Sequence, residues 1–218
     1  MDDCLRREKA LPDRREKVMD WDVFTDLMLS TSIRLFTKDN ENANDVAQKW
    51  AQVVSAAFEK GCFDYALYSE AYRDILRPNG GRLIGIANYY PIALLGDSLD
   101  ASTQNALVSH ILSEENGIYY IYDRRISQLP SEFQSREASY YLAAVELLAQ
   151  YRHGAVKLDF IADWLYAHQD ENGCWDMGKS VNDKLYFPLS DDWRKTENRK
   201  KDCTVRIERI LAKLCFER

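Results

Sequence analysis

Four aspartates near the C-terminal end of the chain are of a type and spacing that could support acid–base chemistry. They are Asp176, Asp191, Asp192 and Asp202. Two carboxylates that face one cleft can act as general acid and general base, as in the hydrolysis of glycosidic bonds. Tyrosine together with arginine could instead carry out lyase chemistry. One hypothesis is therefore an enzyme that uses carboxylates within residues 176–202.

The segment 176–201 is also a long connection between two expected helices, and it is rich in aromatic and basic residues. Connections of this length inside a compact domain are often functional. We expect Asp192, Trp193 and Arg194 to face a ligand at the rim of a cavity, with Arg206 of the next helix beside them. The alternative is a surface loop with local ion pairs, in which Trp193 is a packing anchor.

Two tyrosine pairs form the second candidate binding site. Tyr89-Tyr90 and Tyr140-Tyr141 each lie near the start of an expected helix, in similar local sequences. We expect Tyr89 and Tyr140 to line a concave aromatic cavity that suits a small apolar or sugar-like ligand. The alternative is that these tyrosines pack in the core and serve no ligand.

A metal site or a nucleotide cofactor is not expected. Zinc needs at least three protein ligands, and the nearest cluster is Asp202-Cys203, after which no histidine follows. The chain has no Gly-x-Ser-x-Gly elbow, no Walker A loop and no Gly-x-Gly-x-x-Gly. The five cysteines include no Cys-x-x-Cys pair and are expected to be reduced thiols.

The elements that must position these residues are helices, because every strong hydrophobic period along the chain is helical. The expected helices cover residues 21–35, 43–60, 65–76, 84–95, 106–112, 135–151, 157–168 and 203–216. Residues 118–122 are expected to be extended or irregular. The predicted fold class is therefore all-α.

Three glycines punctuate this helical pattern at a constant interval. Gly61, Gly117 and Gly173 each follow an expected helix, and each is followed two residues later by an aromatic residue. A constant interval of this length is typical of tandem supersecondary repeats. We therefore predict a single domain of helical hairpins over residues 1–218, with a charged lead-in at residues 1–17.

Residues around the third glycine carry a resemblance to a known superfamily. Trp164, Leu165, Gln169, Gly173 and Trp175 stand at the spacing of a QW repeat, a motif of the terpenoid cyclase and protein prenyltransferase superfamily. The resemblance implies an α/α toroid, and at this chain length about four hairpins would make a partial or open one. The motif residues are expected to be structural, with the Gln169 amide bonded to backbone groups at a helix end.

The catalytic motifs of that superfamily are absent. The chain has neither Asp-x-Asp-Asp nor Asp-Asp-x-x-Asp, and Asp202-Cys203 lacks the spacing of the prenyltransferase zinc ligands. The resemblance thus implies a short member without the known catalysis, which binds an apolar or amphipathic ligand or a protein partner. Because α/α toroids also include glycoside hydrolases and polysaccharide lyases, the carboxylate hypothesis stays open. Open hairpin faces could be covered by a second copy.

Composition narrows the partners and the compartment. The chain has 218 residues, 46% of them hydrophobic, and a net charge of −6. A mildly acidic chain is a poor match for nucleic acid or an anionic membrane surface. No run of apolar residues is long enough to span a bilayer, and no signal peptide is visible. We expect a cytoplasmic protein.

Overall fold

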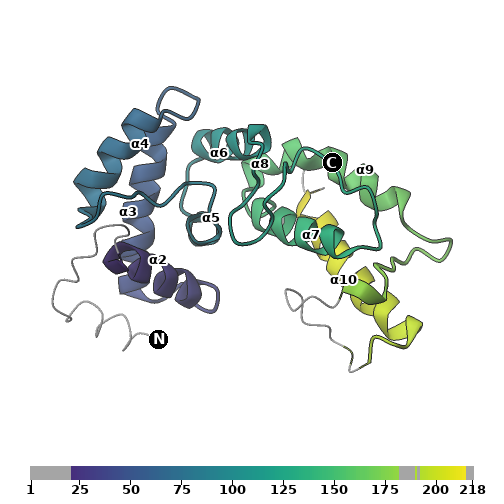
Figure 1. The fold of residues 1–218 in the computed structure, drawn as a ribbon. Helices are drawn as coiled ribbons and strands as arrows, with labels where there is room; N and C mark the ends of the chain where they lie inside the picture. Colours follow the sequence, from purple (N-terminus) through teal and green to yellow (C-terminus); the bar gives the residue numbers. More distant parts are fainter. Residues whose placement is uncertain (1–20, 182–189, 191, 215–218) are drawn as a thin grey trace. The chain divides into compact units, whose positions relative to one another are not determined.

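The computed structural model describes residues 21–181, 190 and 192–214, and over these residues the chain is all-α (Figure 1). The described residues contain no β-strand, and an isolated antiparallel bridge joins Ile118 and Tyr122. The predicted fold class is confirmed at this level. Closure of the hairpins into a toroid stays a prediction. The charged lead-in, residues 1–17, lies outside the described residues.

The chain divides into two compact units, residues 1–110 and residues 111–218. We call them unit 1 and unit 2 and describe each by itself. The sequence predicts one repeat domain over the whole chain, and that statement about how the units combine also stays a prediction.

Unit 1 is built from short helices that pack around α3. They are α2 (Trp21–Arg34), α3 (Glu41–Ala57), α4 (Tyr65–Ala71) and α5 (Tyr89–Leu95), with a π-helical turn at Tyr72–Leu76. Helix α3 packs against both α2 and α4, and α5 packs against α2 and α3 (Figure 1). The short connections between α2 and α3 and between α3 and α4 make these two packed pairs helical hairpins.

Helix α3 shows why the sequence folds in this way. Its N-cap residue, Asn40, accepts a hydrogen bond from the Ala43 N–H and so satisfies one free donor of the first turn. Buried residues recur at three- and four-residue steps along its length, among them Val46, Trp50 and Val54. Gly61, with φ of +80°, turns the chain after the helix.

The predicted helix over residues 84–95 is wrong in its first half. The helix α5 begins only at Tyr89, and Asn88 caps it by accepting from the Tyr90 N–H. Pro91 therefore falls in the first turn, where its missing N–H costs nothing. Residues 84–87 are largely apolar and partly buried without being helical, so hydrophobicity alone could not distinguish them from the helix.

Helix α6 (Ala101–Ser113) contains the boundary between the units. Unit 2 then continues with α7 (Arg136–Leu148), α8 (Arg152–Ala155), α9 (Asp159–Ala167) and α10 (Thr196–Leu214). Single 3₁₀ turns lie at Val156–Leu158 and Lys179–Val181. Helix α10 packs against α8 and α9, and its buried residues include Ile207 and Ile210.

The last helix begins seven residues before the predicted start. Prediction placed it at residues 203–216, whereas α10 starts at Thr196. Its first two turns, residues 196–201, are entirely polar, so no hydrophobic period marks them. Arg199 is nevertheless buried there, because it is paired with Asp176. The long connection is therefore shorter than expected. In the part of the chain that the structure describes, no helix is long and apolar enough to cross a membrane.

Candidate ligand-binding groove

A pocket of about 670 Å³ lies in unit 2, between the loop 117–126 and the first turns of α7. We call it the tyrosine groove. Its lining residues are Tyr119, Tyr120, Ile121, Tyr122, Asp123, Arg124, Arg136, Glu137 and Tyr140. A pocket of this volume is in the range that holds small molecules.

Apolar residues spaced four apart anchor the loop to the interior of unit 2. Ile118, Tyr122 and Ile126 are buried, and the Tyr141 hydroxyl of α7 donates to the Ile126 carbonyl at 3.0 Å. The Ile118 N–H donates to the Tyr122 carbonyl at 2.7 Å, and the Tyr122 N–H donates back at 2.9 Å. The loop is therefore a closed, hydrogen-bonded turn and not an extended segment.

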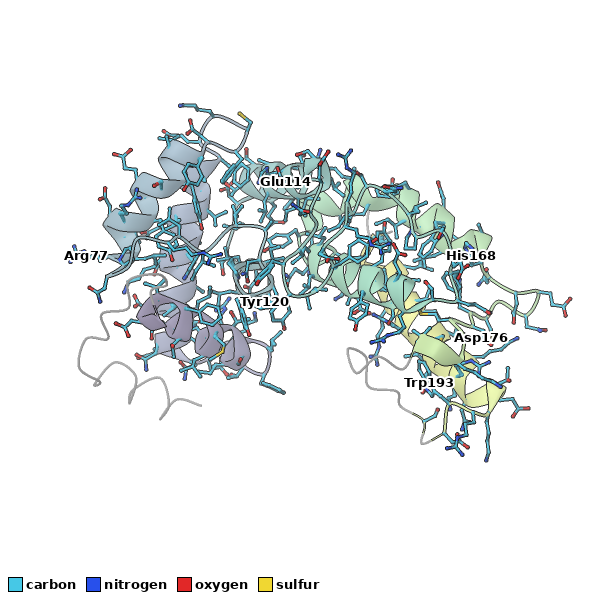
Figure 2. The ribbon with its side chains drawn as sticks, in the orientation of Figure 1. Arg77, Glu114, Tyr120, His168, Asp176 and Trp193 are labelled. Atoms are coloured by element: carbon cyan, nitrogen blue, oxygen red, sulfur yellow. The ribbon has the colours of Figure 1, made fainter. Side chains whose placement is uncertain are left out.

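The tip of this turn exposes two aromatic rings. Tyr119 is 61% exposed and Tyr120 is 55% exposed, and their ring centroids lie 4.3 Å apart with planes at 51°. Tyr120, labelled in Figure 2, has φ of +77°, a conformation that a side chain with Cβ rarely adopts. Strain of this kind is held in place by the surrounding contacts and is common at functional sites.

Gly117 allows the turn to close. A Cβ at this position would lie 2.4 Å from the Arg124 carbonyl oxygen and 2.5 Å from that of Tyr122. Its φ is not positive, unlike that of Gly61 and Gly173. The three evenly spaced glycines therefore have two different structural roles. Two permit a left-handed turn, and the middle one permits a close approach of backbone.

Charged groups form the other side of the groove. Glu137 Oε1 accepts from Arg124 Nη1 at 2.7 Å and from the Tyr122 hydroxyl at 3.3 Å. Partial burial, with the nearby Glu137 carboxylate, raises the pKa of Tyr122 to about 12, so this phenol stays neutral at physiological pH. Arg136 donates from Nη2 to the Tyr140 hydroxyl, and its guanidinium carbon lies 5.9 Å from that ring's centroid.

Of the six residues predicted to line a cleft, Tyr140 lies in the tyrosine groove. Tyr89 belongs to unit 1, where it is the first residue of α5 and its ring contacts Tyr90 at 5.2 Å. A shared cavity for Tyr89 and Tyr140 stays a prediction. Tyr141, the neighbour of Tyr140, is fully buried.

Arg206 has a structural place in the core of unit 2. Its guanidinium donates to Ser139 Oγ at 2.9 Å, to the Ser139 carbonyl at 3.1 Å and to Glu146 Oε1 at 3.0 Å. These contacts join α10 to α7. The residue is only 2% exposed and does not line the tyrosine groove.

Asp202 anchors the segment that precedes α10 through hydrogen bonds. Its carboxylate accepts from the Ser190 N–H, the Ser190 hydroxyl and the Trp193 indole N–H, the last at 2.6 Å. The carboxylate of Asp192 accepts from the Arg194 N–H, and Arg194 itself is exposed. Trp193 is thus anchored to α10, and Asp191 lies outside the described residues.

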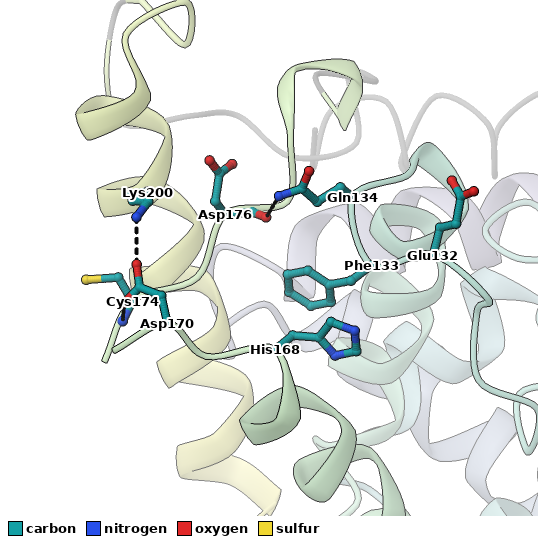
Figure 3. Close-up of a pocket in the computed structure, with 8 residues that line it drawn as sticks. All are labelled: Glu132, Phe133, Gln134, His168, Asp170, Cys174, Asp176 and Lys200. Atoms are coloured by element: carbon teal, nitrogen blue, oxygen red, sulfur yellow. Dashed lines mark hydrogen bonds and ion pairs between the residues drawn. The ribbon is translucent and has the colours of Figure 1, made fainter. Parts of the chain in front are cut away.

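A second pocket, of about 700 Å³, lies at the end of the QW-like segment (Figure 3). We call it the QW-end pocket. Figure 3 shows the Lys200–Asp170 ion pair and the Gln134 amide bonded to the Asp176 carbonyl. His168 stacks on Phe133 with centroids 4.6 Å apart, and its Nδ1 donates to the Trp164 carbonyl. Asp176 is bound by Arg199 through two hydrogen bonds of 2.6 and 2.7 Å.

The QW-like residues form a cap after α9. The indole N–H of Trp175 donates to the Leu165 carbonyl at 2.7 Å, and the ring is 2% exposed. The Gln169 amide donates to the Gly173 carbonyl at 2.9 Å, where Gly173 has φ of +78°. Trp164 packs its ring on Tyr141. All these contacts are structural.

Among the described residues, no group of three or more His, Cys, Asp and Glu side chains could hold a metal ion. Cys203 is buried, which raises the pKa of its thiol to about 11. Its neighbour Asp202 is occupied by Ser190 and Trp193. The pair Asp202-Cys203 is therefore used in packing and loop anchoring.

No protein-family model, curated protein or solved structure matches this chain. The relation to the terpenoid cyclase and protein prenyltransferase superfamily rests on the QW-like residues and stays a prediction.

Sequence reasoning missed most of the groove, including Tyr119, Tyr120, Arg136 and Glu137. Residues 118–122 were predicted to be extended or irregular, because an apolar run of five residues shows neither the helical nor the strand periodicity. The signal that was present is the four-residue spacing of Ile118, Tyr122 and Ile126. Residues between such anchors must point away from the core, which would place two tyrosines at the surface.

Proposed function

We propose that unit 2 is a binding module that holds a small amphipathic ligand in the tyrosine groove and does not transform it. The observation that carries the proposal is the pair Tyr119 and Tyr120. More than half of each side chain is exposed, yet both are held on a turn closed by backbone hydrogen bonds. Rigid aromatic side chains on a preorganised loop give contact area at low entropic cost.

The carboxylates support binding over catalysis. Asp176 is paired with Arg199, and Asp202 accepts three hydrogen bonds from Ser190 and Trp193. The Arg199 guanidinium lowers the pKa of Asp176, so this carboxylate stays ionised near neutral pH, and the Asp202 carboxylate is already occupied by three donors. The hypothesis of a glycoside hydrolase or lyase that uses residues 176–202 therefore gains no support from their contacts.

The superfamily relation remains part of the proposal in a structural sense only. The cap formed by Gln169, Gly173 and Trp175 after α9 is what a scaffold motif would supply. It positions no reactive group.

The proposal is tested by saturation-transfer NMR on the full chain with a mixed panel of uncharged amphipathic compounds, including aromatic glycols, sterol-like rings and saccharides. We expect at least one class to bind, with a loss of signal in Tyr119→Ala. The matched control is Tyr65→Ala on α4, because Tyr65 is 66% exposed and lies outside the groove. Absence of binding by every class, or equal loss in both variants, would refute the proposal.

A further inference from the structure

We infer that the ligand of the tyrosine groove is a neutral, polyhydroxylated ring, that is, a saccharide unit. The inference rests on the proposed function and names the chemical class of its ligand. It is carried by the charge balance of the groove, by its hydrogen-bonding groups and by the arrangement of its two exposed rings.

The charges in the groove cancel. Asp123 and Glu137 are negative, Arg124 and Arg136 are positive, and no other ionised side chain lines the pocket. Glu137 and Arg124 are already paired at 2.7 Å. Because these four charges sum to zero, the groove has no net charge that would favour a strongly anionic or cationic ligand over a neutral one. A neutral ligand fits this charge balance and leaves the Glu137–Arg124 pair in place.

The groove also presents many donors and acceptors around its aromatic faces. Glu137 contacts Tyr122 and Arg124 through Oε1 alone, which leaves Oε2 for a ligand. Arg124 and Arg136 each use one terminal nitrogen in the described hydrogen bonds and keep further N–H donors. An entirely apolar ligand would strip water from these groups without replacing its hydrogen bonds. Hydroxyl groups, which donate and accept, would satisfy them.

The two exposed rings complete the match. Tyr119 and Tyr120 lie at 51° to each other and offer two differently oriented flat surfaces at one edge of the groove. A saccharide ring has an apolar face of C–H groups and an edge of hydroxyls. It can therefore pack on a tyrosine with its face while its edge meets Glu137 and the arginines.

The test is isothermal titration of the full chain with methyl pyranosides and linear di- to hexasaccharides, beside uncharged aromatic amphiphiles of similar size. We expect saccharides to bind, with the affinity falling about tenfold in Tyr119→Ala and several-fold in Glu137→Gln. Tyr65→Ala should leave the affinity unchanged. Glu137→Gln keeps the side-chain shape, so a loss there reports the carboxylate acceptor and not the fold, which far-ultraviolet circular dichroism would check.

The outcomes separate this inference from the function on which it rests. If aromatic amphiphiles bind in a Tyr119-dependent way and no saccharide does, the saccharide inference fails and the binding function stands. If neither class binds, the proposed function fails with it. If saccharides bind but Tyr119→Ala and Glu137→Gln keep the wild-type affinity, the groove is not the site and the inference is overturned.

Discussion

At the scale of single residues, the loop 117–126 concentrates two backbone requirements within four positions. Gly117 leaves no room for a Cβ, and Tyr120 occupies the left-handed region that favours glycine. The first requirement can be met only by glycine, whereas the second is met here by a tyrosine. Because glycine would adopt this conformation with less strain, the tyrosine at this position supports a role for its side chain.

Tyr120→Gly and Tyr120→Ala distinguish these contributions. Both variants lose the phenol ring, but only glycine adopts φ of +77° without strain. We expect the glycine variant to have a free energy of unfolding about 1 kcal/mol larger than the alanine variant. Urea denaturation measures the difference. Equal stability of the two variants would mean that the turn relaxes to another conformation.

Gly117→Ala should destabilise the fold far more than Gly85→Ala. Its new Cβ would meet two backbone carbonyl oxygens, so the turn must open, at a cost of about 3 kcal/mol. The control is Gly85→Ala, where a Cβ meets nothing within 4 Å and φ is not positive. Thermal unfolding of both variants tests this, and a Gly117→Ala protein as stable as Gly85→Ala would contradict it.

At the scale of elements, the first turns of α10 depend on a buried ion pair. Arg199 holds the pKa of Asp176 below its ordinary value through their hydrogen bonds. Because the pKa is lower in the folded state, the pair stabilises the fold fully above the unfolded pKa of about 3.9. Its contribution is lost as the pH falls through the lower folded pKa.

Asp176→Asn should therefore lower the free energy of unfolding by about 3 kcal/mol at neutral pH, because it leaves Arg199 buried without a counterion. The gap to the wild type should be constant above about pH 5 and shrink below about pH 4. Denaturation at a series of pH values measures it. Asp45→Asn is the control, since its pair with Lys49 is half exposed and worth less than about 1 kcal/mol. A gap that does not depend on pH would exclude the pair as its cause.

The same elements show what sequence can and cannot predict. The apolar stripe of α3 and the turn at Gly61 were predictable, because burial repeats with the helical period there. The start of α10 was not, because residues 196–201 are polar and Arg199 is buried only through a partner 23 residues away. The groove was partly predictable. Tyr140 stood out as one of a pair, whereas Arg136 and Glu137 depend on contacts with a distant loop.

At the scale of the whole molecule, the division into two compact units predicts that a destabilising substitution in one unit leaves the stability of the other unit unchanged. Gly117→Ala should raise hydrogen exchange in peptides from residues 114–214, with peptides from residues 21–100 close to the wild type. Mass spectrometry of exchanged peptides measures this, with α6 left out because it contains the boundary. Equal gains in both units would show that they unfold as one cooperative body.

Cys203 provides the molecule with its own reporter of rare opening. It is 1% exposed and its thiol pKa is raised to about 11, whereas Cys62 is exposed and Cys174 is half-buried. A thiol-directed reagent should therefore modify Cys62 at once and reach Cys203 only when the structure around α10 opens. The slow phase of labelling would measure how often that happens under native conditions. Any ligand that stabilises unit 2 should slow that phase without affecting the reaction at Cys62.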